Sequence, residues 1–485
     1  MSNQNIKIGI DLGTTNSEVA VSKGGTVEIV KNIFGDEYTP SVFGVDKAGN
    51  KVVGKKAYER LFKDSSPEEF KNNKAEVKRL MGTSDTVHFE RLGKDMTAEE
   101  ISAEILKSLK EDVVRKHPGF DTRAAVITIP AYFSALQAEA TKRAGTLAGF
   151  EHVVLLQEPI AAAISYGFMN AKDENWLVYD LGGGTFDVAL ISSKEGSLSV
   201  LGQNGDNFLG GKDFDNLIVD KVIVPKLLEG FNLSDFDRNN PEYRSVFAKL
   251  KYYAEQAKVY LSQYDSYTIE VENIGTDTDG KEIYTTVEIS RSEFEELIRP
   301  LVDRTINLAS KTIVESGIKP ASVHKVILVG GPTQIPYIRQ RLEQKLQIEI
   351  DTSADPLTAV ARGACIFATS QRIPQELSSK DKPAEAGTKT LTLYYDSLTS
   401  EDEESVSGVV NELKDSDEEY YIQIQSDSGH YGGTKLKLNK GKFFDTVTIE
   451  PQKENLFWIY LFDKQGNAVP MDPDSFSITH GLSVS

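Results

Sequence analysis

Two segments of this 485-residue chain follow the same pattern, and this repeat restricts the possible fold more than any other feature. Residues 7–20 read as a strand, a glycine turn and a second strand, and residues 177–190 repeat that order. Each segment has Asp-Leu-Gly at its turn, beginning at Asp11 and at Asp180. We interpret the repeat as a structural duplication, in which two related lobes each present one hairpin.

Strands and helices alternate around the two hairpins, which is typical of an α/β domain. Thr97 with Glu100 forms a capping box, and Ser134 with Gln137 forms another, so that each predicts the start of a helix. The apolar run at 153–157 predicts a buried strand, and a helix is expected directly after it. The first 370 residues are therefore expected to form one α/β unit.

The pattern changes after this unit. Residues 371–388 are polar, contain two prolines and show no periodicity, which predicts a linker. From 389 to 485, short alternating runs are separated by turns, which predicts a small antiparallel β-domain of the sandwich type. The acidic runs at 401–404 and 415–419 are interpreted as solvated loops.

Composition limits the class of partner. The formal net charge of −19 repels a phosphate backbone and argues against nucleic acid as the main partner. No run of about 18 apolar residues is present, so no membrane span is expected. The single cysteine, Cys365, cannot form an intramolecular disulfide, and the N-terminus does not resemble a secretory signal. These features predict a cytoplasmic protein.

The two hairpin turns contain glycines and hydroxyl side chains, a composition that suits a polyphosphate. Because glycine has no Cβ, the backbone N–H groups of a tight turn can converge on anionic oxygens. A single glycine turn is usually no more than a turn, but two matched turns would hold one polyphosphate from two sides. The residues are Gly13, Thr14, Thr15 and Asn16 in the first turn and Gly182, Gly183, Gly184 and Thr185 in the second.

Three aspartates border the turns: Asp11 and Asp180 precede them, and Asp187 follows the second. A carboxylate beside bound phosphate repels it unless a cation lies between them, and Mg²⁺ that keeps most of its waters suits that position. We therefore expect Mg²⁺ at Asp11 and Asp180, through water. The alternative is that these carboxylates only cap the turns through backbone hydrogen bonds.

Two further residues are candidates for phosphoryl chemistry. Glu158 lies where the predicted strand meets Pro159, so its carboxylate either holds an attacking water or only favours the start of a helix. Lys78 is a candidate for placing a positive charge on the terminal phosphate. Spacing alone does not decide either case.

Seven motifs occur in order along residues 5–370. Together they resemble the ATPase domain of the heat-shock protein 70 (DnaK-type) chaperones, within the actin and sugar-kinase superfamily. This resemblance implies an actin-like fold with duplicated ribonuclease-H-like lobes, lobe I at about 1–168 plus 355–370 and lobe II at about 169–354. The motifs are IGIDLGTTNS, VKRLMG, ITIPAYF, QEPIAAAISYG, VYDLGGGTFD, LGGKDFD and ILVGGPTQIP.

The resemblance also implies roles for individual residues. Lys78 matches the catalytic lysine on the γ-phosphate, and Glu158 matches the acid that positions the attacking water. Asp11, Asp180 and Asp187 match the carboxylates around Mg²⁺ and its waters. Thr185 is expected to act both in catalysis and in the second phosphate loop. The residues expected to contact adenosine are Glu255, Lys258, Ser262, Gly330 and Gly331.

Several positions differ from the family pattern. They lie near the adenine, in the late helix, or where the interdomain linker or a J-domain co-chaperone docks, so they concern communication and not hydrolysis. Pro130, the proposed switch proline, is present. The differing positions are Gln334 near the adenine, Leu357 in the late helix, Ala138 where the partner of the switch proline is expected, and Val154, Gln157 and Ile160 at the docking surface.

The resemblance predicts an ATPase that binds ATP or ADP with Mg²⁺ between the lobes and regulates the binding of unfolded or specific protein clients. A nucleotide-exchange factor is a further expected partner, whereas the changed docking positions argue against a J-domain. One alternative is a nucleotide-gated scaffold with a dedicated partner on the β-domain, and another is a small-molecule kinase. Residues 389–485 match neither the family's peptide-binding sandwich nor its helical lid. They are therefore also interpreted as an inserted module that precedes a peptide-binding domain.

Overall fold

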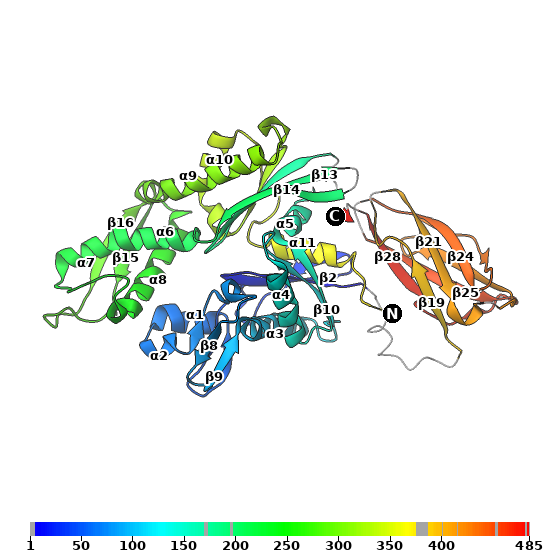
Figure 1. The fold of residues 1–485 in the computed structure, drawn as a ribbon, viewed down its shortest axis with the longest axis horizontal. Coiled ribbons are helices and arrows are strands. Elements are labelled where there is room, and N and C mark those ends of the chain that lie inside the picture. Colours follow the sequence, from blue (N-terminus) through cyan, green and yellow to red (C-terminus); the bar gives the residue numbers. More distant parts are fainter. Residues whose placement is uncertain are drawn as a thin grey trace.

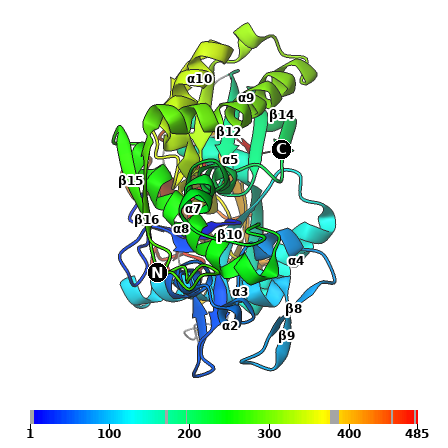
Figure 2. The ribbon, with the colours of Figure 1, turned by 90° about the vertical axis from the view of Figure 1, so that its left-hand side faces the viewer.

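Two α/β lobes and a β-rich C-terminal region make up the computed structural model of the chain (Figure 1). The structure describes residues 5–168, 173–194, 197–374, 387–399, 401–414, 416–451, 454–480 and 483–484. Figure 2 shows the two lobes at opposite ends of the view, with α9 and α10 at one end and α3, β8 and β9 at the other. Among the described residues, no helix combines the length and apolarity needed to cross a membrane.

The sheet of the first lobe has the order β11-β10-β1-β2-β3, and β4 pairs with β2. β11, β10 and β1 run parallel, whereas β1, β2 and β3 are antiparallel hairpin neighbours. The strands are β1 (Ile8–Leu12), β2 (Asn16–Lys23), β3 (Thr26–Ile29), β4 (Thr39–Pro40), β10 (Ala124–Ile129) and β11 (His152–Gln157).

The sheet of the second lobe repeats this arrangement in the order β18-β17-β12-β13-β14-β29. β18, β17 and β12 run parallel, and β12, β13 and β14 are antiparallel neighbours. The central strands of the two sheets therefore share one topology, as the repeated hairpins predict. The strands are β12 (Asn175–Leu181), β13 (Phe186–Lys194), β14 (Ser197–Asp206), β17 (Lys325–Val329), β18 (Ile350–Asp351) and β29 (Ser483–Val484).

Helices pack against both sheets. Both predicted capping boxes are present, at the starts of α3 and α4. A helix over 336–346 and a strand over 197–206 were not predicted, because neither segment has a strong periodic pattern of its own. The helices are α3 (Ala98–Lys116), α4 (Ala135–Leu147), α5 (Glu158–Ser165), α6 (Gly211–Ile218), α7 (Val224–Gly230), α8 (Arg244–Leu261), α9 (Arg291–Glu315), α10 (Pro336–Leu346) and α11 (Ala359–Ala368).

Smaller elements complete the outer part of each lobe. In the first lobe they follow the hairpin and lead to the long helix α3, and in the second they form one hairpin beside α8. They are α1 (Lys55–Glu59), α2 (Pro67–Phe70), β5 (Phe43–Val45), β6 (Lys51–Val53), β7 (Asn73–Lys74), β8 (Thr86–Phe89), β9 (Lys94–Thr97), β15 (Ser266–Val271) and β16 (Thr285–Ser290).

Helices α11 and α5 cross at unusually close range beneath the cleft. A Cβ on Gly363 of α11 would lie 1.6 Å from the carbonyl oxygen of Ala161 in α5. A Cβ on Gly9 of β1 would lie 2.1 Å from the backbone nitrogen of Cys365. Cys365 is fully buried there. This packing fixes α5, and with it the position of Glu158 at its first turn.

The C-terminal region contains two sheets that share one cluster of buried hydrophobic side chains. One sheet has the order β24-β21-β19-β27, and the other has the order β20-β28-β25-β22-β23, with β26 beside β25. The strands are β19 (Lys389–Tyr394), β20 (Leu398–Thr399), β21 (Glu403–Val410), β22 (Tyr420–Ser426), β23 (Leu436–Lys437), β24 (Lys442–Thr448), β25 (Glu454–Asp463), β26 (Ala468–Val469), β27 (Met471–Asp472) and β28 (Ser475–His480).

Three predictions for this region need correction. Glu403 and Glu404 begin strand β21 and are not loop residues, because their neighbours at 406, 408 and 410 supply a buried alternating face. β19 pairs parallel with β27 and β20 parallel with β28, so the sheets are not wholly antiparallel. The apolar run around Trp458 predicts a core side chain, but Trp458 is only half-buried and its indole N–H donates to Asp427.

The C-terminal region contacts the first 370 residues. The hydroxyl of Ser397 donates to the carbonyl oxygen of Ser370 at 2.6 Å, and the guanidinium of Arg372, just beyond those residues, lies 3.5 Å from the centre of the Tyr395 ring. β29 also pairs with β14 at the edge of the second sheet. Most of the predicted linker, 375–386, lies outside the described residues.

Candidate active site

The two hairpin turns meet across the gap between the lobes. A Cβ on Gly183 would lie 2.4 Å from the hydroxyl oxygen of Thr15, so glycine is needed for the turns to approach. The second turn is closed by a hydrogen bond from the Gly182 N–H to the Thr185 carbonyl oxygen at 2.9 Å. The structure therefore brings together two turns that are about 170 residues apart in the chain.

A cavity of about 120 Å³ lies at this meeting point, and most of the predicted site residues line it. Leu357, one of the positions that differ from the family pattern, also lines it. The predicted residues in its wall are Asp11, Gly13, Thr14, Thr15, Asn16, Lys78, Glu158, Asp180, Gly182, Gly183, Gly184, Thr185, Asp187, Gly330 and Gly331.

Glu255 and Lys258 line an adjoining cavity of about 70 Å³, which shares Thr14, Thr15 and Gly183 with the first. Both residues belong to α8 and face the gap between the lobes. Ser262 follows the last residue of α8 and lines neither cavity; its hydroxyl donates to the Lys258 carbonyl oxygen at 3.4 Å. Ser262 therefore lies one helical turn beyond Lys258, outside both cavities.

Lys78 and Glu158 form a buried ion pair, with 2.6 Å between Nζ and Oε1. Lys78 comes from a 3₁₀ turn over Val77–Leu80, and Glu158 is the first residue of α5. Burial alone would lower the pKa of Lys78, but the charges of Glu158 and Asp11 outweigh burial and raise it. Lys78 therefore stays a cation, and Glu158 both begins a helix and lines the cleft.

The aspartates form a compact acidic group around this pair. Burial, followed by the charge of Glu158, raises the pKa of Asp11 to about 7 and that of Asp187 to about 7. The same two causes raise the pKa of Asp180 well above its usual range. Asp11 also accepts a hydrogen bond from the Thr128 hydroxyl at 3.1 Å. Positive charge from a ligand would favour the ionised form of this acidic group.

Glu18 is a fifth carboxyl of this cavity, and sequence reasoning missed it. It lies directly opposite Asp11 in the β1–β2 hairpin and is only 5% exposed. Burial, followed by the charge of Asp11, raises its pKa well above the usual range. The available signal was a glutamate inside the strand 17–22, whose other residues are all small or apolar.

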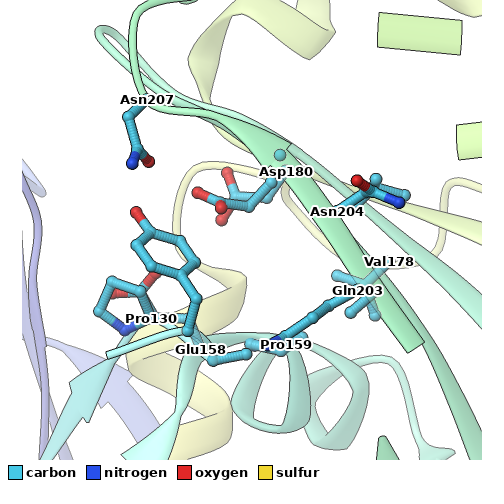
Figure 3. A pocket seen from close by; sticks show the side chains of 14 residues that line it. Pro130, Glu158, Pro159, Val178, Asp180, Gln203, Asn204 and Asn207 are labelled. Atoms are coloured by element: carbon cyan, nitrogen blue, oxygen red, sulfur yellow. The ribbon is translucent and has the colours of Figure 1, made fainter. Parts of the chain in front are cut away.

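Behind the carboxylates lies a third cavity, of about 350 Å³, which we call the rear cavity. It shares Pro130, Tyr132, Glu158, Asp180 and Asp187 with the cleft. Figure 3 shows it with Pro130 and Glu158 on the side of the first lobe and Asp180 and Asn204 on the side of the second. The acidic group therefore has an open space on two sides. The rear cavity is lined by Pro130, Ala131, Tyr132, Glu158, Pro159, Val178, Asp180, Asp187, Val188, Ala189, Gln203, Asn204, Gly205 and Asn207.

Polar contacts join the lobes across the cleft. The hydroxyl of Tyr58 donates to Glu255, and Nζ of Lys212 lies 3.0 Å from Oε1 of Glu76. The guanidinium of Arg79 donates to the carbonyl oxygen of Gly184 at 2.9 Å. These contacts hold the two lobes together beside α8 and beside the second turn.

The other positions that differ from the family pattern lie partly on the surface and partly in the core. Ile160 is buried in a hydrophobic cluster and Val154 is half-buried against it, while Gln157 is exposed. Ala138 belongs to α4, and Pro130 lines both the cleft and the rear cavity. Two of the three positions predicted at a docking surface are therefore partly or wholly withdrawn from the surface.

No three His, Cys, Asp or Glu side chains among the described residues are grouped so that they alone would hold a metal ion. The arrangement suits instead a cation with few protein ligands that keeps water and binds phosphate oxygens, as Mg²⁺ does. The carboxylates of Asp11 and Asp180 lie on opposite lobes beside the phosphate turns and offer the hard oxygen atoms that Mg²⁺ prefers.

Comparison with known proteins agrees with this geometry. The family description "Hsp70 protein" matches residues 7–373. The chain belongs to the Hsp70 family. The actin-like ATPase fold of the Hsp70 family accounts for the two α/β lobes with a cleft between them.

Individual Hsp70 relatives match the same part of the chain. A "Chaperone protein DnaK" of Mycoplasma mobile is 41% identical over 360 residues, which is 74% of this chain and 57% of that protein. Proteins of the same name from Thermotoga petrophila and Mycoplasmopsis agalactiae are 38% and 40% identical, and the matches cover 59% and 58% of their lengths. The chain thus matches less than two thirds of the length of these relatives.

Proposed function

We propose that this Hsp70 family member binds ATP and ADP in the cleft and hydrolyses ATP. One observation above all supports the proposal: two glycine turns from matched hairpins meet beside one buried lysine and a group of carboxyls. Backbone N–H groups of both turns are available to phosphate oxygens, and the net negative charge of the wall calls for a cation with the nucleotide.

Each residue then has a proposed role. Gly13 to Asn16 and Gly182 to Thr185 would hold the phosphates, and Asp11 and Asp180 would hold Mg²⁺, which would supply positive charge to the phosphate oxygens. Lys78 exchanges its contact with Glu158 for the terminal phosphate, which frees Glu158 to orient the attacking water. Asp187 and Thr185 complete the set around that water. Preorganised charge of this kind stabilises the transition state of phosphoryl transfer to water.

The adenosine is proposed to lie toward α8, because Glu255 and Lys258 line the adjoining cavity and share its wall with the phosphate turns. Gly330 and Gly331 line the phosphate cavity on the side of the second lobe. We keep Ser262 as a proposed contact through the end of α8, although it lies outside both cavities.

The domain organisation remains part of the proposal. We assign residues 1–370 to the ATPase domain, with lobe I at about 1–168 plus 355–370 and lobe II at about 169–354. Residues 371–388 are the proposed linker, and 389–485 the proposed small all-β, sandwich-like domain. Cytoplasmic location, an exchange factor and the absence of J-domain docking stay predictions.

The relatives named "Chaperone protein DnaK" favour protein clients as the partners of this chain. The test is steady-state ATP hydrolysis by the full chain with Mg²⁺, with and without a reduced, unfolded polypeptide. A severalfold stimulation supports ATP-regulated client binding. Hydrolysis that ignores unfolded polypeptide favours the scaffold with one dedicated partner, and transfer of the γ-phosphate to a metabolite hydroxyl favours the kinase.

A further inference from the structure

Strand β28 lies on the side of the C-terminal region that faces the lobes (Figure 1). Its Phe476 and Ile478 belong to the hydrophobic core of that region. Because side chains alternate along a strand, Ser477 and Thr479 lie on the opposite face, yet they are only 3% and 5% exposed. Lobe I covers this polar face, since Ser477 lines one cavity together with residues of lobe I.

That cavity has a volume of about 330 Å³, and we call it the junction cavity. It shares no lining residue with the cleft, with the cavity beside α8 or with the rear cavity. Ligand sites in proteins range upward from about 300 Å³, so the junction cavity is large enough for a small molecule and too small for a folded partner. Any ligand that it holds is therefore bound apart from the nucleotide.

The two walls of the junction cavity carry opposite charges. Lobe I contributes Lys7, and the C-terminal region contributes Asp427 and Glu454. In the part of the chain that the structure describes, no ion pair joins this lysine to either carboxylate. One oxygen of Asp427 accepts the indole N–H of Trp458 at 2.9 Å, which fixes the carboxylate at the edge of the cavity. The opposite charges therefore remain available to a ligand that lies between the walls.

Both walls also bury hydroxyl groups that lack partners. Ser22 of β2 and Ser477 of β28 line the cavity, and both are buried. Neither hydroxyl forms a hydrogen bond among the described residues. The buried hydroxyl oxygen of Thr479, which lies opposite Glu454 in the sheet, has no partner there either. Burying a polar group without a partner is costly, so orphaned hydroxyls beside a charged cavity indicate a missing ligand.

We propose that the junction cavity binds a small zwitterion of the α-amino acid class. The ammonium group of the ligand lies against Asp427 and Glu454, and its carboxylate lies against Lys7, so that both ends form charge-assisted hydrogen bonds. The hydroxyls of Ser22 and Ser477 supply further hydrogen bonds. A molecule with a single charge satisfies one wall and leaves the other uncompensated. The bound ligand joins the C-terminal region to lobe I, and this site does not depend on the proposed nucleotide site.

The test is the binding of free α-amino acids to the full chain. The common amino acids are offered together in equilibrium dialysis, and mass spectrometry measures which of them the protein retains. We expect the wild type to retain at least one. Lys7→Gln and Glu454→Gln should each bind that amino acid at least about tenfold more weakly, because each variant removes charge from one wall. Binding should also change the fluorescence of Trp458, because its indole N–H donates to Asp427.

Lys47→Gln and Glu403→Gln are the matched controls. Lys47 is an exposed lysine of lobe I, and Glu403 is an exposed glutamate at the start of β21, in the other sheet of the C-terminal region. Both variants should bind the amino acid as the wild type does. Circular dichroism verifies that every variant is folded. The proposal is overturned if the folded wild type retains no amino acid, if Lys7→Gln and Glu454→Gln both bind normally, or if the controls lose binding equally.

Discussion

At the scale of single residues, the cleft concentrates acidic groups around one lysine. Lys78 and Glu158 neutralise each other at 2.6 Å while Asp11, Asp180 and Asp187 surround them. Burial raises the pKa of these aspartates, so a cation bound beside them would favour their ionised form. The protonation of these carboxyls therefore depends on the charge of the bound ligand.

This arrangement predicts how the stability of the nucleotide-free protein depends on pH. Asp187 has a native pKa of about 7, above the value of 3.8 for an ordinary aspartate, so the folded state holds its proton between about pH 4 and pH 7 while the unfolded state does not. The unfolding free energy should therefore fall as pH rises through this window, by at most about 4 kcal/mol for this residue. Urea unfolding at pH 5 and pH 8 measures the loss, which should be smaller in Asp187→Asn. An equal loss in both proteins would contradict the assignment.

Glu158 should matter for hydrolysis more than for binding. In Glu158→Gln the amide oxygen still accepts from Lys78, so the fold should persist, but the carboxylate that orients water is gone. We expect single-turnover ATP hydrolysis to slow by about 100-fold, with the affinity for ADP changed less than about threefold. Glu151→Gln, an exposed glutamate just before β11, is the control and should hydrolyse ATP normally. A normal rate in Glu158→Gln would remove Glu158 from the proposed mechanism.

At the scale of elements, two hairpins and one helix crossing place the site. The hairpins supply the phosphate turns and four of the carboxyls, Asp11, Glu18, Asp180 and Asp187. The crossing of α11 over α5 positions Glu158, because Gly363 lets the two helices approach at Ala161. The chemistry therefore depends on backbone packing that lies outside the cleft itself.

Gly363→Ala tests the crossing. Alanine is the better helix former by about 1 kcal/mol, yet its Cβ would lie 1.6 Å from the Ala161 carbonyl oxygen, so the helices must separate. We expect a net destabilisation of about 3 kcal/mol in urea unfolding, together with slower ATP hydrolysis. Gly230→Ala, at the end of α7 with open space around it, is the control and should be neutral or stabilising. A stable, active Gly363→Ala protein would show that α5 is not positioned in this way.

Local signals in the sequence predicted many of these helices and strands. The capping boxes at Thr97 and Ser134 begin α3 and α4, and the repeated Asp-Leu-Gly marks both hairpins. The pairing of Asp11 with Glu18 needed the strand register, which no single segment specifies. Strand β21 was missed at its acidic start because its buried face becomes clear only when the neighbouring strands are present.

Long-range contacts also limited what could be predicted of the site. The glycine turns, Lys78 and Glu158 were predicted, and the structure brings them together in one cavity. The rear cavity was not predicted, because its walls combine segments near 130, 158, 180 and 205 that meet only in the folded chain. Ser262 was predicted as an adenosine contact and lies outside the cavities, because the residue follows the last turn of α8.

At the scale of the whole molecule, the lobes are held together by contacts around the cleft. Tyr58 donates to Glu255, and Lys212 pairs with Glu76. A nucleotide that enters or leaves must break these contacts if the lobes have to separate. Release of ADP should therefore depend on side chains that never touch its phosphates.

Tyr58→Phe removes one such contact and keeps the ring. Loss of a hydrogen bond worth about 1 kcal/mol predicts ADP release that is about fivefold faster. Tyr284→Phe is a matched control, because Tyr284 donates to Glu270 at 2.8 Å wholly within lobe II. Stopped-flow displacement of a fluorescent ADP analogue measures both rates. Equal acceleration in the two variants, or none in Tyr58→Phe, would contradict the prediction that the contact between Tyr58 and Glu255 slows ADP release.

The central claim is that the cleft hydrolyses ATP with Lys78 at the terminal phosphate, and single-turnover hydrolysis of γ-labelled ATP tests it most directly. Wild type is compared with Lys78→Ala and with Lys71→Ala, which removes a lysine from an exposed pair with Glu90 in the same lobe. We predict measurable Mg²⁺-dependent hydrolysis in the wild type, a loss of about 100-fold or more in Lys78→Ala, and no change in Lys71→Ala. Hydrolysis at the wild-type rate in Lys78→Ala, or none in the folded wild type, would contradict the account.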